Sequence, residues 1–413
     1  MYINLSVRHY FSSLCCGLLI LLFSLGGPAY ASSLVESDTA KVAVADHSAK
    51  ARSQAQKEAL RQVFIKMSGT PSVLSNEQVR RAVNNASDYL VAYRYSQPQD
   101  TLFYNASFGK EALDAILRQE QLPRWGTRRP DTLFWLAVEQ QNQRWILREN
   151  QPEPLGVALN EAAARRGIPV ALPLMDLTDN TNIGISDVWG QFGRVLRKAS
   201  SRYTPDFILS ARLFEKGSSA ETQGLSTEQK LEQALAASNL MFETQAENND
   251  ETNNTDASVA DDITHTMPKL HGEGQYTLEW VLLENGASQY GTIRADSPQA
   301  SVTQLMEQYA DYLAKRFSVR FNKEGTSDNA LIVSVANLDS LTHYVHAQEF
   351  LSQLSVVDSA VLTKQNGSVA TFSLQLMGNR NDFFNALSFE SKLRPVTDSF
   401  GQALEGNNFY WNE

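Results

Sequence analysis

The sequence predicts a fold of mixed α/β and α+β class, built from three small modules. Strand-like apolar runs alternate with amphipathic helical segments along most of the chain, and this alternation is typical of layered helix-and-sheet domains. The chain has 413 residues, of which 42% are hydrophobic and 20% charged, as in soluble globular proteins with more than one core. We expect modules at residues 32–122, 131–320 and 328–413, with a junction at residues 123–130.

The N-terminus has the pattern of a secretory signal peptide at residues 1–31. Arg8 and His9 precede an uncharged apolar run at residues 14–25, and two glycines, a proline and the triplet "AYA" follow it. A basic region, an apolar region and an A-x-A site are the parts of such a signal, and the run is shorter than the roughly 20 residues that span a bilayer. We therefore expect cleavage after Ala31, a periplasmic location and no membrane span in the mature chain.

Both cysteines, Cys15 and Cys16, lie inside the signal peptide. The mature chain therefore has no thiol for a disulfide, a cysteine nucleophile, an iron–sulfur cluster or a thiolate zinc site. A formal net charge of −10 argues against general nucleic-acid binding. The sequence indicates no cofactor.

Most of the negative charge lies in an insertion of the middle module, at about residues 217–270. Between Glu215 and Asp262 there are eleven acidic residues and two lysines. The part "TQAENNDETNNTDASVADD" is rich in Asn and poor in aromatics, and such a composition buries too little apolar surface to offset its ordering entropy. We expect a disordered loop, since a calcium site lacks the D-x-D-x-D-G frame.

In the first module, "SLVESDTAKVAV" alternates like a strand. Asp46 or Ser48 can cap the following helix, "AKARSQAQKEALRQVFIKMSG", and Gly69 ends it. A short helix near residues 77–83, the strands "SDYLVAYRYSQ" and "TLFYNASFG", and a helix at residues 110–121 complete the module.

The middle module opens with "DTLFWLAVE", a nearly continuous apolar run typical of a strand covered on both faces. The helix "PLGVALNEAAARRG", the strand "IPVALPLM", the helix "SDVWGQFGRVLRKASSRY" and the strand "PDFILSARLFE" follow. Beyond the acidic insertion, "GEGQYTLEWVLLENGASQYGTIRAD" predicts a hairpin that turns at Asn285-Gly286. A helix at about residues 301–317 closes a layered α/β sheet domain.

The third module has the element order βαββαβ. From Asn329, "ALIVSVANL" is a strand, "LTHYVHAQEFLSQL" a helix, "VVDSAVLTKQ" and "GSVATFSLQLMG" a hairpin around Asn366-Gly367, "RNDFFNALSFES" a helix and "KLRPV" a last edge strand before a tail. This order predicts the ferredoxin-like arrangement.

Several of these stretches together resemble an uncharacterised family. The export signal, "ALRQVFIKMSG", "LPRWGTRRPDTLFWLAVE" and the βαββαβ module resemble gammaproteobacterial envelope proteins defined only as a domain of unknown function, over most of the mature chain apart from the acidic insertion. The first module is also similar to the N-terminal domain of the flagellar outer-ring assembly protein T. The middle module, through "PDFILSARL" and "YTLEWVLLENG", is similar to the amino-terminal domain of the Tol translocation protein B. The third module resembles neither, and the family implies no activity.

Signatures of catalysis are sparse. The G-x-S-x-G, H-E-x-x-H, P-loop and dinucleotide-binding patterns do not occur. Ser107 and Lys110 match the S-x-x-K of serine acyltransferases at a strand-to-helix junction, but the companion motifs of that class are incomplete. His343 and His346 stand three apart on a predicted helix without a visible third ligand, so we expect no metal site.

The stretch "LPRWGTRRPDTLFWLAVE" supplies the candidate binding residues Arg124, Trp125, Arg128 and Arg129. Two prolines and a glycine punctuate it, and this spacing favours a fixed junction between modules. In that role the tryptophan packs against one module, and the arginines cap carbonyls of the preceding helix or pair with acids across the boundary. The alternative is a site for an anionic envelope ligand, such as a phospholipid headgroup or a glycan.

We expect from these observations a non-catalytic periplasmic accessory or assembly protein of the cell envelope, which acts through contacts with a partner protein. Fold analogy carries this expectation. The alternatives are a periplasmic binding protein for an anionic or apolar envelope ligand, and a serine hydrolase or acyltransferase that uses Ser107 and Lys110. A cleft with convergent polar groups favours the alternatives, whereas broad exposed sheet edges favour assembly.

Overall fold

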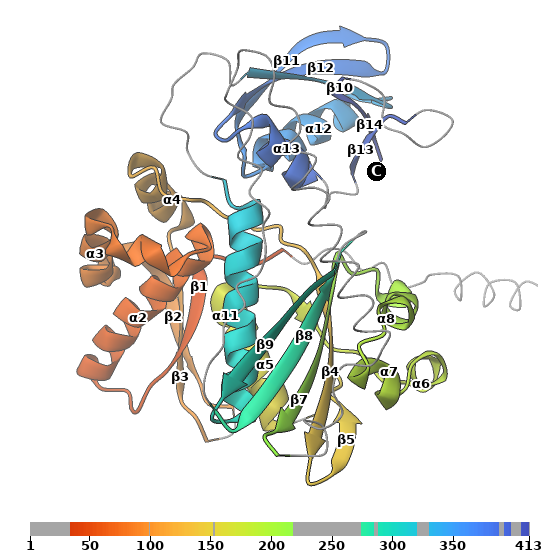
Figure 1. Ribbon diagram of the computed structural model, residues 1–413. Coiled ribbons are helices and arrows are strands. Elements are labelled where there is room, and N and C mark those ends of the chain that lie inside the picture. Colours follow the sequence, from red (N-terminus) through yellow and green to blue (C-terminus); the bar gives the residue numbers. More distant parts are fainter. Residues whose placement is uncertain are drawn as a thin grey trace, which may run out of the picture.

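The computed structural model describes most of the chain after the predicted signal peptide: residues 34–98, 100–151, 153–217, 274–284, 288–319, 330–387, 392–397 and 406–412. Within these residues three sheets and their helices form three modules (Figure 1), and the predicted fold class is confirmed. The predicted signal peptide and, from residue 218 on, the predicted acidic loop lie outside the described residues.

The N-terminal module packs a three-stranded antiparallel sheet, of order β1-β3-β2, against a long helix. Its elements are β1 (Thr39–Ala43), α2 (Ala49–Ser68), η1 (Pro71–Ser75), α3 (Glu77–Asn84), η2 (Ala86–Tyr89), β2 (Leu90–Ser96), β3 (Phe103–Phe108) and α4 (Lys110–Gln119). Ser48 caps α2 by accepting a hydrogen bond from the Ala51 amide at 3.2 Å. Gly69 ends the helix with a φ of 80°, which confirms both predicted signals. The core fills the α2 face of the sheet.

The middle module is a sheet covered on both faces. Its elements are β4 (Thr132–Gln140), β5 (Gln143–Ile146), α5 (Pro154–Arg166), β6 (Val170–Ala171), α6 (Leu177–Asn182), α7 (Ile185–Trp189), α8 (Gly193–Ser200), η3 (Ser201–Tyr203), β7 (Phe207–Glu215), β8 (Tyr276–Leu283), β9 (Ser288–Ala295) and α11 (Pro298–Phe317). The strand order is β5-β4-β7-β8-β9, with β6 beside β4. Helices α5 and α11 cover one face and α6 to α8 the other (Figure 1), each over its own apolar cluster.

Two predictions for the middle module need correction. The helix predicted across "SDVWGQFGRVLRKASSRY" is interrupted between α7 and α8, because Gln191 takes a positive φ of 52° and cannot continue a helix. The strand predicted as "IPVALPLM" is reduced to the two residues of β6. The hairpin strands β8 and β9 pair as expected from Tyr276↔Ala295 to Leu283↔Ser288, while the predicted turn at Asn285-Gly286 lies outside the described residues.

The third module confirms the predicted order βαββαβ and adds a strand to it. Its elements are β10 (Ala330–Ala336), α12 (Leu341–Gln353), β11 (Val357–Asn366), β12 (Val369–Leu376), α13 (Arg380–Leu387), β13 (Leu393–Pro395) and β14 (Asn408–Trp411). The sheet order is β11-β12-β10-β14-β13. Strand β14, which falls in the predicted tail, lies parallel to β10 and separates it from β13. The helices lie on the side of the sheet that faces the other modules (Figure 1).

Candidate functional site

The residues predicted as a binding cluster meet where the modules join. Trp125 is 4% exposed, and its backbone amide donates to the Met67 carbonyl of α2 at 2.6 Å. Gly69 approaches so closely that a Cβ on it would lie 3.0 Å from the Trp125 ring and 2.5 Å from the Ala314 Cβ of α11. Trp125 therefore fills the contact between the N-terminal module and α11.

Arg129 is fully buried at the point where the C-terminal ends of α2 and α5 converge. Its guanidinium donates to the carbonyl of Lys66 at 2.5 Å, to those of Arg166 and Gly167 at 2.8 and 2.7 Å, and to that of Gly126 at 3.1 Å. The C-terminal end of a helix carries partial negative charge, so one cation neutralises two helix ends. We predicted that the arginines cap the preceding helix; for Arg129 the capped helices are α2 and α5.

The charge of Arg129 is buried away from water. Burial, and after it the neighbouring Arg166 guanidinium, lower the pKa of Arg129. The Arg129 guanidinium also lies 3.9 Å over the Trp125 ring, a contact that stabilises a cation. The carbonyls and the ring thus replace the water that this charge has lost.

Arg166, which we did not single out from the sequence, forms a second set of contacts that joins the helices. Its guanidinium contacts Glu307 and Asp311 of α11, each at 2.5 Å, and donates to the Gly69 carbonyl at 2.9 Å. Arg166 is therefore bound to α2 and α11 while it belongs to α5. The available signal was the arginine pair directly before Gly167, the C-cap glycine of α5.

Arg124 extends the junction to the third module. Its Nε lies 2.5 Å from the Asp114 carboxylate of α4, and its Nη1 donates to the Ser355 carbonyl at 3.5 Å and to the Met377 sulfur at 3.1 Å. Its backbone pairs in both directions with Val319, just beyond α11. The side chains of Arg124, Trp125 and Arg129 are thus engaged within the chain, which favours the junction interpretation; the binding role predicted for the four residues stays a prediction.

Arg128 is half-buried and lies on the N-terminal side of the same junction. The backbone of Arg128 forms an antiparallel bridge with Leu34, and the neighbouring Val35 amide donates to the Thr127 carbonyl at 2.9 Å. The segment ahead of β1 is therefore held against the junction loop.

A cleft of about 660 Å³ opens between the N-terminal sheet and α5. Its floor is the face of the sheet opposite α2, and its wall is formed by α5 and the C-terminal half of α2. The charged residues that line it are Glu36, Lys41, Lys66, Arg94, Glu161 and Arg165. The cleft therefore carries more cations than anions.

Lys66 closes one end of this cleft. Its Nζ donates to the Thr39 carbonyl of β1 at 2.7 Å. Burial, and after it the charge of Arg129, lower the pKa of Lys66 to about 8, although Asp38 and Glu36 act in the opposite direction. The ammonium is still protonated in neutral solution.

Among the described residues, no hydrogen bond joins Ser107 to Lys110. Ser107 lies inside the ladder of β3, where its Oγ donates to the Ala92 carbonyl at 3.4 Å. Lys110 begins α4 and is exposed. Ser107 lines the cleft, but Lys110 is not among the lining residues.

The two histidines of the predicted pair lie on α12 in different settings. His343 is half-buried and its backbone amide donates to Ser340 Oγ at 3.2 Å, whereas His346 is exposed. In the part of the chain that the structure describes, no three His, Cys, Asp or Glu side chains gather where they could hold one metal ion.

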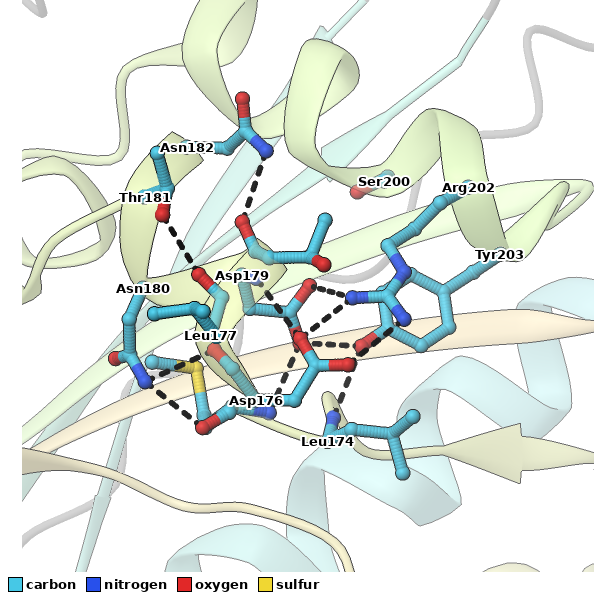
Figure 2. Close-up of polar contacts among 12 residues, drawn as sticks. Leu174, Asp176, Leu177, Asp179, Asn180, Thr181, Asn182, Ser200, Arg202 and Tyr203 are labelled. Atoms are coloured by element: carbon cyan, nitrogen blue, oxygen red, sulfur yellow. Dashed lines mark hydrogen bonds and ion pairs between the residues drawn. The ribbon is translucent and has the colours of Figure 1, made fainter.

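A polar cluster around Arg202, not expected from the sequence, lies beside α6 (Figure 2). Arg202 donates to both oxygens of Asp176, at 2.7 and 2.9 Å, and to Asp179 at 3.0 Å. Tyr203 donates to Asp179 at 2.5 Å and accepts from the Leu174 amide at 2.9 Å. The hydrogen bond from Arg202 lowers the pKa of Asp176 to about 2. The donors and acceptors satisfy one another, so this cluster ties the turn before α6 to η3.

Comparisons with known proteins cover two segments of the chain. Residues 31–126 match the family described as Domain of unknown function (DUF8605), and residues 330–403 match the family DUF2066. These matches are consistent with the predicted resemblance to an uncharacterised family, and they correspond to the N-terminal module and to the third module ahead of β14. Comparison with curated proteins gave no match, and comparison with solved structures gave none. Among the described helices, none is both long enough and apolar enough to cross a membrane.

Proposed function

We propose that the protein is a non-catalytic accessory or assembly protein of the periplasm, which holds two partner-binding surfaces at a fixed spacing. The basic and apolar N-terminus with its A-x-A triplet supports export. The resemblance to gammaproteobacterial envelope proteins supports a place in the cell envelope, as do the similarities of single modules to the flagellar outer-ring assembly protein T and the Tol translocation protein B.

One observation carries the proposal: the sheet of the middle module is covered on both faces, whereas the outer modules leave apolar sheet residues open. On the edge strand β2, Val91 is 71% exposed. In the third module Ile332 and Val361 are 63% and 56% exposed, and they lie in one row across the sheet through Ser373. Exposed apolar side chains that adjoin one another on an open sheet can mark a docking surface.

The junction supplies the fixed spacing. Trp125, Arg129 and Arg166 bind α2, α5 and α11 together, and Arg124 adds the third module through Ser355. Groups that are paired within a buried junction resist rearrangement, because breaking them leaves charges and carbonyls unsatisfied. The middle module thus serves as a rigid spacer.

Photocrosslinking in cells tests the proposal. A photoreactive residue is placed singly at Val91, at Ile332, and at Lys198, an exposed control position on α8 of the middle module. We expect protein adducts from both of the first two positions and background labelling at Lys198. Background labelling at Val91 or at Ile332, or equal labelling at all three positions, contradicts the proposal.

The alternative of a binding protein for an anionic ligand is favoured by one feature, the surplus of cations in the cleft beside β1. The junction is a weaker place for such a ligand, because the described contacts of Arg124 and Arg129 lie within the chain. The test of the cleft below separates a small anion from a protein segment.

A further inference from the structure

Strand β1 is an edge strand whose backbone groups turn alternately toward and away from its neighbour. The Asp38 carbonyl accepts from Phe108 at 3.0 Å, and the Val44 amide donates to Leu102 at 2.9 Å. In an antiparallel ladder every second residue makes such bonds, so the odd-numbered residues of β1 turn outward. The Thr39 carbonyl, which accepts from Lys66, does so.

Two residues of this edge keep their outward backbone groups open. Within the described residues, the outward amides and carbonyls of Lys41 and Ala43 make no hydrogen bond. An open edge presents donors and acceptors at the spacing of a further strand. Together these two residues offer four such groups.

The open edge lies inside the cleft. All five residues of β1 line it, and Glu161, Ala164 and Arg165 of α5 form the opposite wall. An extended peptide can add a strand to an exposed sheet edge of this kind. The Lys41 side chain does not obstruct the edge, because its Nζ lies 3.9 Å over the Phe103 ring on the sheet.

The charges in the cleft specify what kind of segment fits. Lys41 and Arg94 lie on the floor of the cleft and are exposed. Lys66 lies at the end of the cleft where its ammonium binds the Thr39 carbonyl. On the wall, Arg165 has a distant carboxylate neighbour, Glu307, at 3.9 Å. Opposing them in the cleft are Glu36 and Glu161, which leaves the cations in excess.

We propose that the free edge of β1 receives an extended acidic peptide segment of a partner protein as an added strand, with main-chain bonds to Lys41 and Ala43 and carboxylates facing the cations of the cleft. Side chains of an extended segment alternate between two faces, so its acidic residues should recur at every second position. The inference rests on the proposed function and names the chemistry of one partner.

A backbone variant separates strand addition from simple charge attraction. Ala43→Pro removes an outward amide that the β1–β3 ladder does not use, and proline is tolerated at such an edge position. Ala43→Val keeps the amide and is the matched control. Arg94→Glu reverses a charge on the floor, and Arg61→Glu, on the exposed side of α2 next to Glu58, is its control.

The probe is a displayed library of random decapeptides, selected on the purified mature chain. We expect enriched peptides with acidic residues at alternate positions. One of them, synthesised, should slow hydrogen exchange at the Lys41 and Ala43 amides. Its affinity should fall at least about tenfold for Ala43→Pro and for Arg94→Glu, and it should be unchanged for Ala43→Val and Arg61→Glu. Thermal unfolding and the exchange of the Val42 amide verify that Ala43→Pro is folded.

Three results overturn the inference. The selection yields no acidic peptides; or the peptide binds Ala43→Pro as tightly as the wild type; or Arg94→Glu abolishes binding while Ala43→Pro does not, which marks the cleft as an anion site without strand addition. If any of these occurs while Val91 and Ile332 still crosslink to partners in cells, the inference fails and the proposed function stands. If crosslinking fails as well, both fall.

Discussion

At the scale of single residues, the junction depends on a cation placed at helix ends. Arg129 meets the carbonyls of Lys66, Arg166 and Gly167, and none of its hydrogen-bond partners in the described part of the chain is a carboxylate. Two helix C-termini supply the negative potential that an acid would otherwise provide. The arrangement suits arginine in particular, because its planar fork carries five donors in fixed directions.

Trp125→Ala should destabilise the protein by about 3–5 kcal/mol, the usual cost of removing a large buried aromatic side chain. Arg118→Ala is the control: its ion pairs with Asp114 and Asp358 are partly exposed, so the loss should stay within about 1 kcal/mol. Urea unfolding of the mature chain measures both. A Trp125→Ala variant with unchanged stability that no longer binds its envelope partner would support the ligand-site interpretation instead.

The lowered pKa of Lys66 predicts that the stability of the protein depends on pH. Its pKa in the folded chain is about 8, below the roughly 10.4 of an unfolded lysine. Between these values the unfolded chain binds more protons, so the contribution of Lys66 to the free energy of unfolding rises as the pH rises through this window. Urea midpoints of the wild type should therefore increase relative to those of Lys66→Met from pH 8 to pH 10.5. Parallel curves would contradict the assigned environment.

At the scale of elements, local signals identified most boundaries. Ser48 and Gly69 delimit α2, and the Asn366-Gly367 turn between β11 and β12 has the expected positive φ at Gly367, 60°. These features depend on neighbouring residues only. The break at Gln191 was missed because helical periodicity continues across it, and β14 was missed because four residues show too little alternation to predict a strand.

The candidate site was harder to predict than the elements. Arg129 meets Lys66 and Arg166, which lie 63 and 37 positions away. The cleft joins Lys41, Arg94 and Arg165 from three different elements. No local pattern encodes such contacts, so a sequence reveals the arginine and tryptophan of the junction but not their partners, and it does not reveal the cleft.

We predict that strand β14 stabilises the third module. Phe409 and Trp411 are buried, and the Asn337 side chain donates to the Trp411 carbonyl at 2.8 Å. Trp411→Ala should lower the free energy of unfolding by about 3–5 kcal/mol. Tyr410→Ala, at an exposed position of the same strand, should lower it far less. Proteolytic susceptibility of residues 330–412 reports the difference. Equal resistance of the two variants would show that β14 contributes little.

At the scale of the whole molecule, the proposed location makes a direct prediction. Cleavage after Ala31 gives a mature chain that begins at Ser32 and that is released by osmotic shock. N-terminal sequencing of the released protein measures this. Recovery of a chain that begins at Met1, or retention in membranes after a high-salt wash, would exclude the proposed export.

The proposed function requires that the junction hold the two outer modules at one spacing. Because the chain's two cysteines lie within residues 1–31, cysteines introduced at Val91 and Ile332 of the mature form can be spin-labelled selectively. Pulsed electron resonance then gives the distribution of distances between the outer sheets. We predict one narrow distribution in the wild-type background, which broadens when Trp125→Ala is added. A broad distribution already in the wild-type background would show that the junction does not fix the spacing of the outer modules.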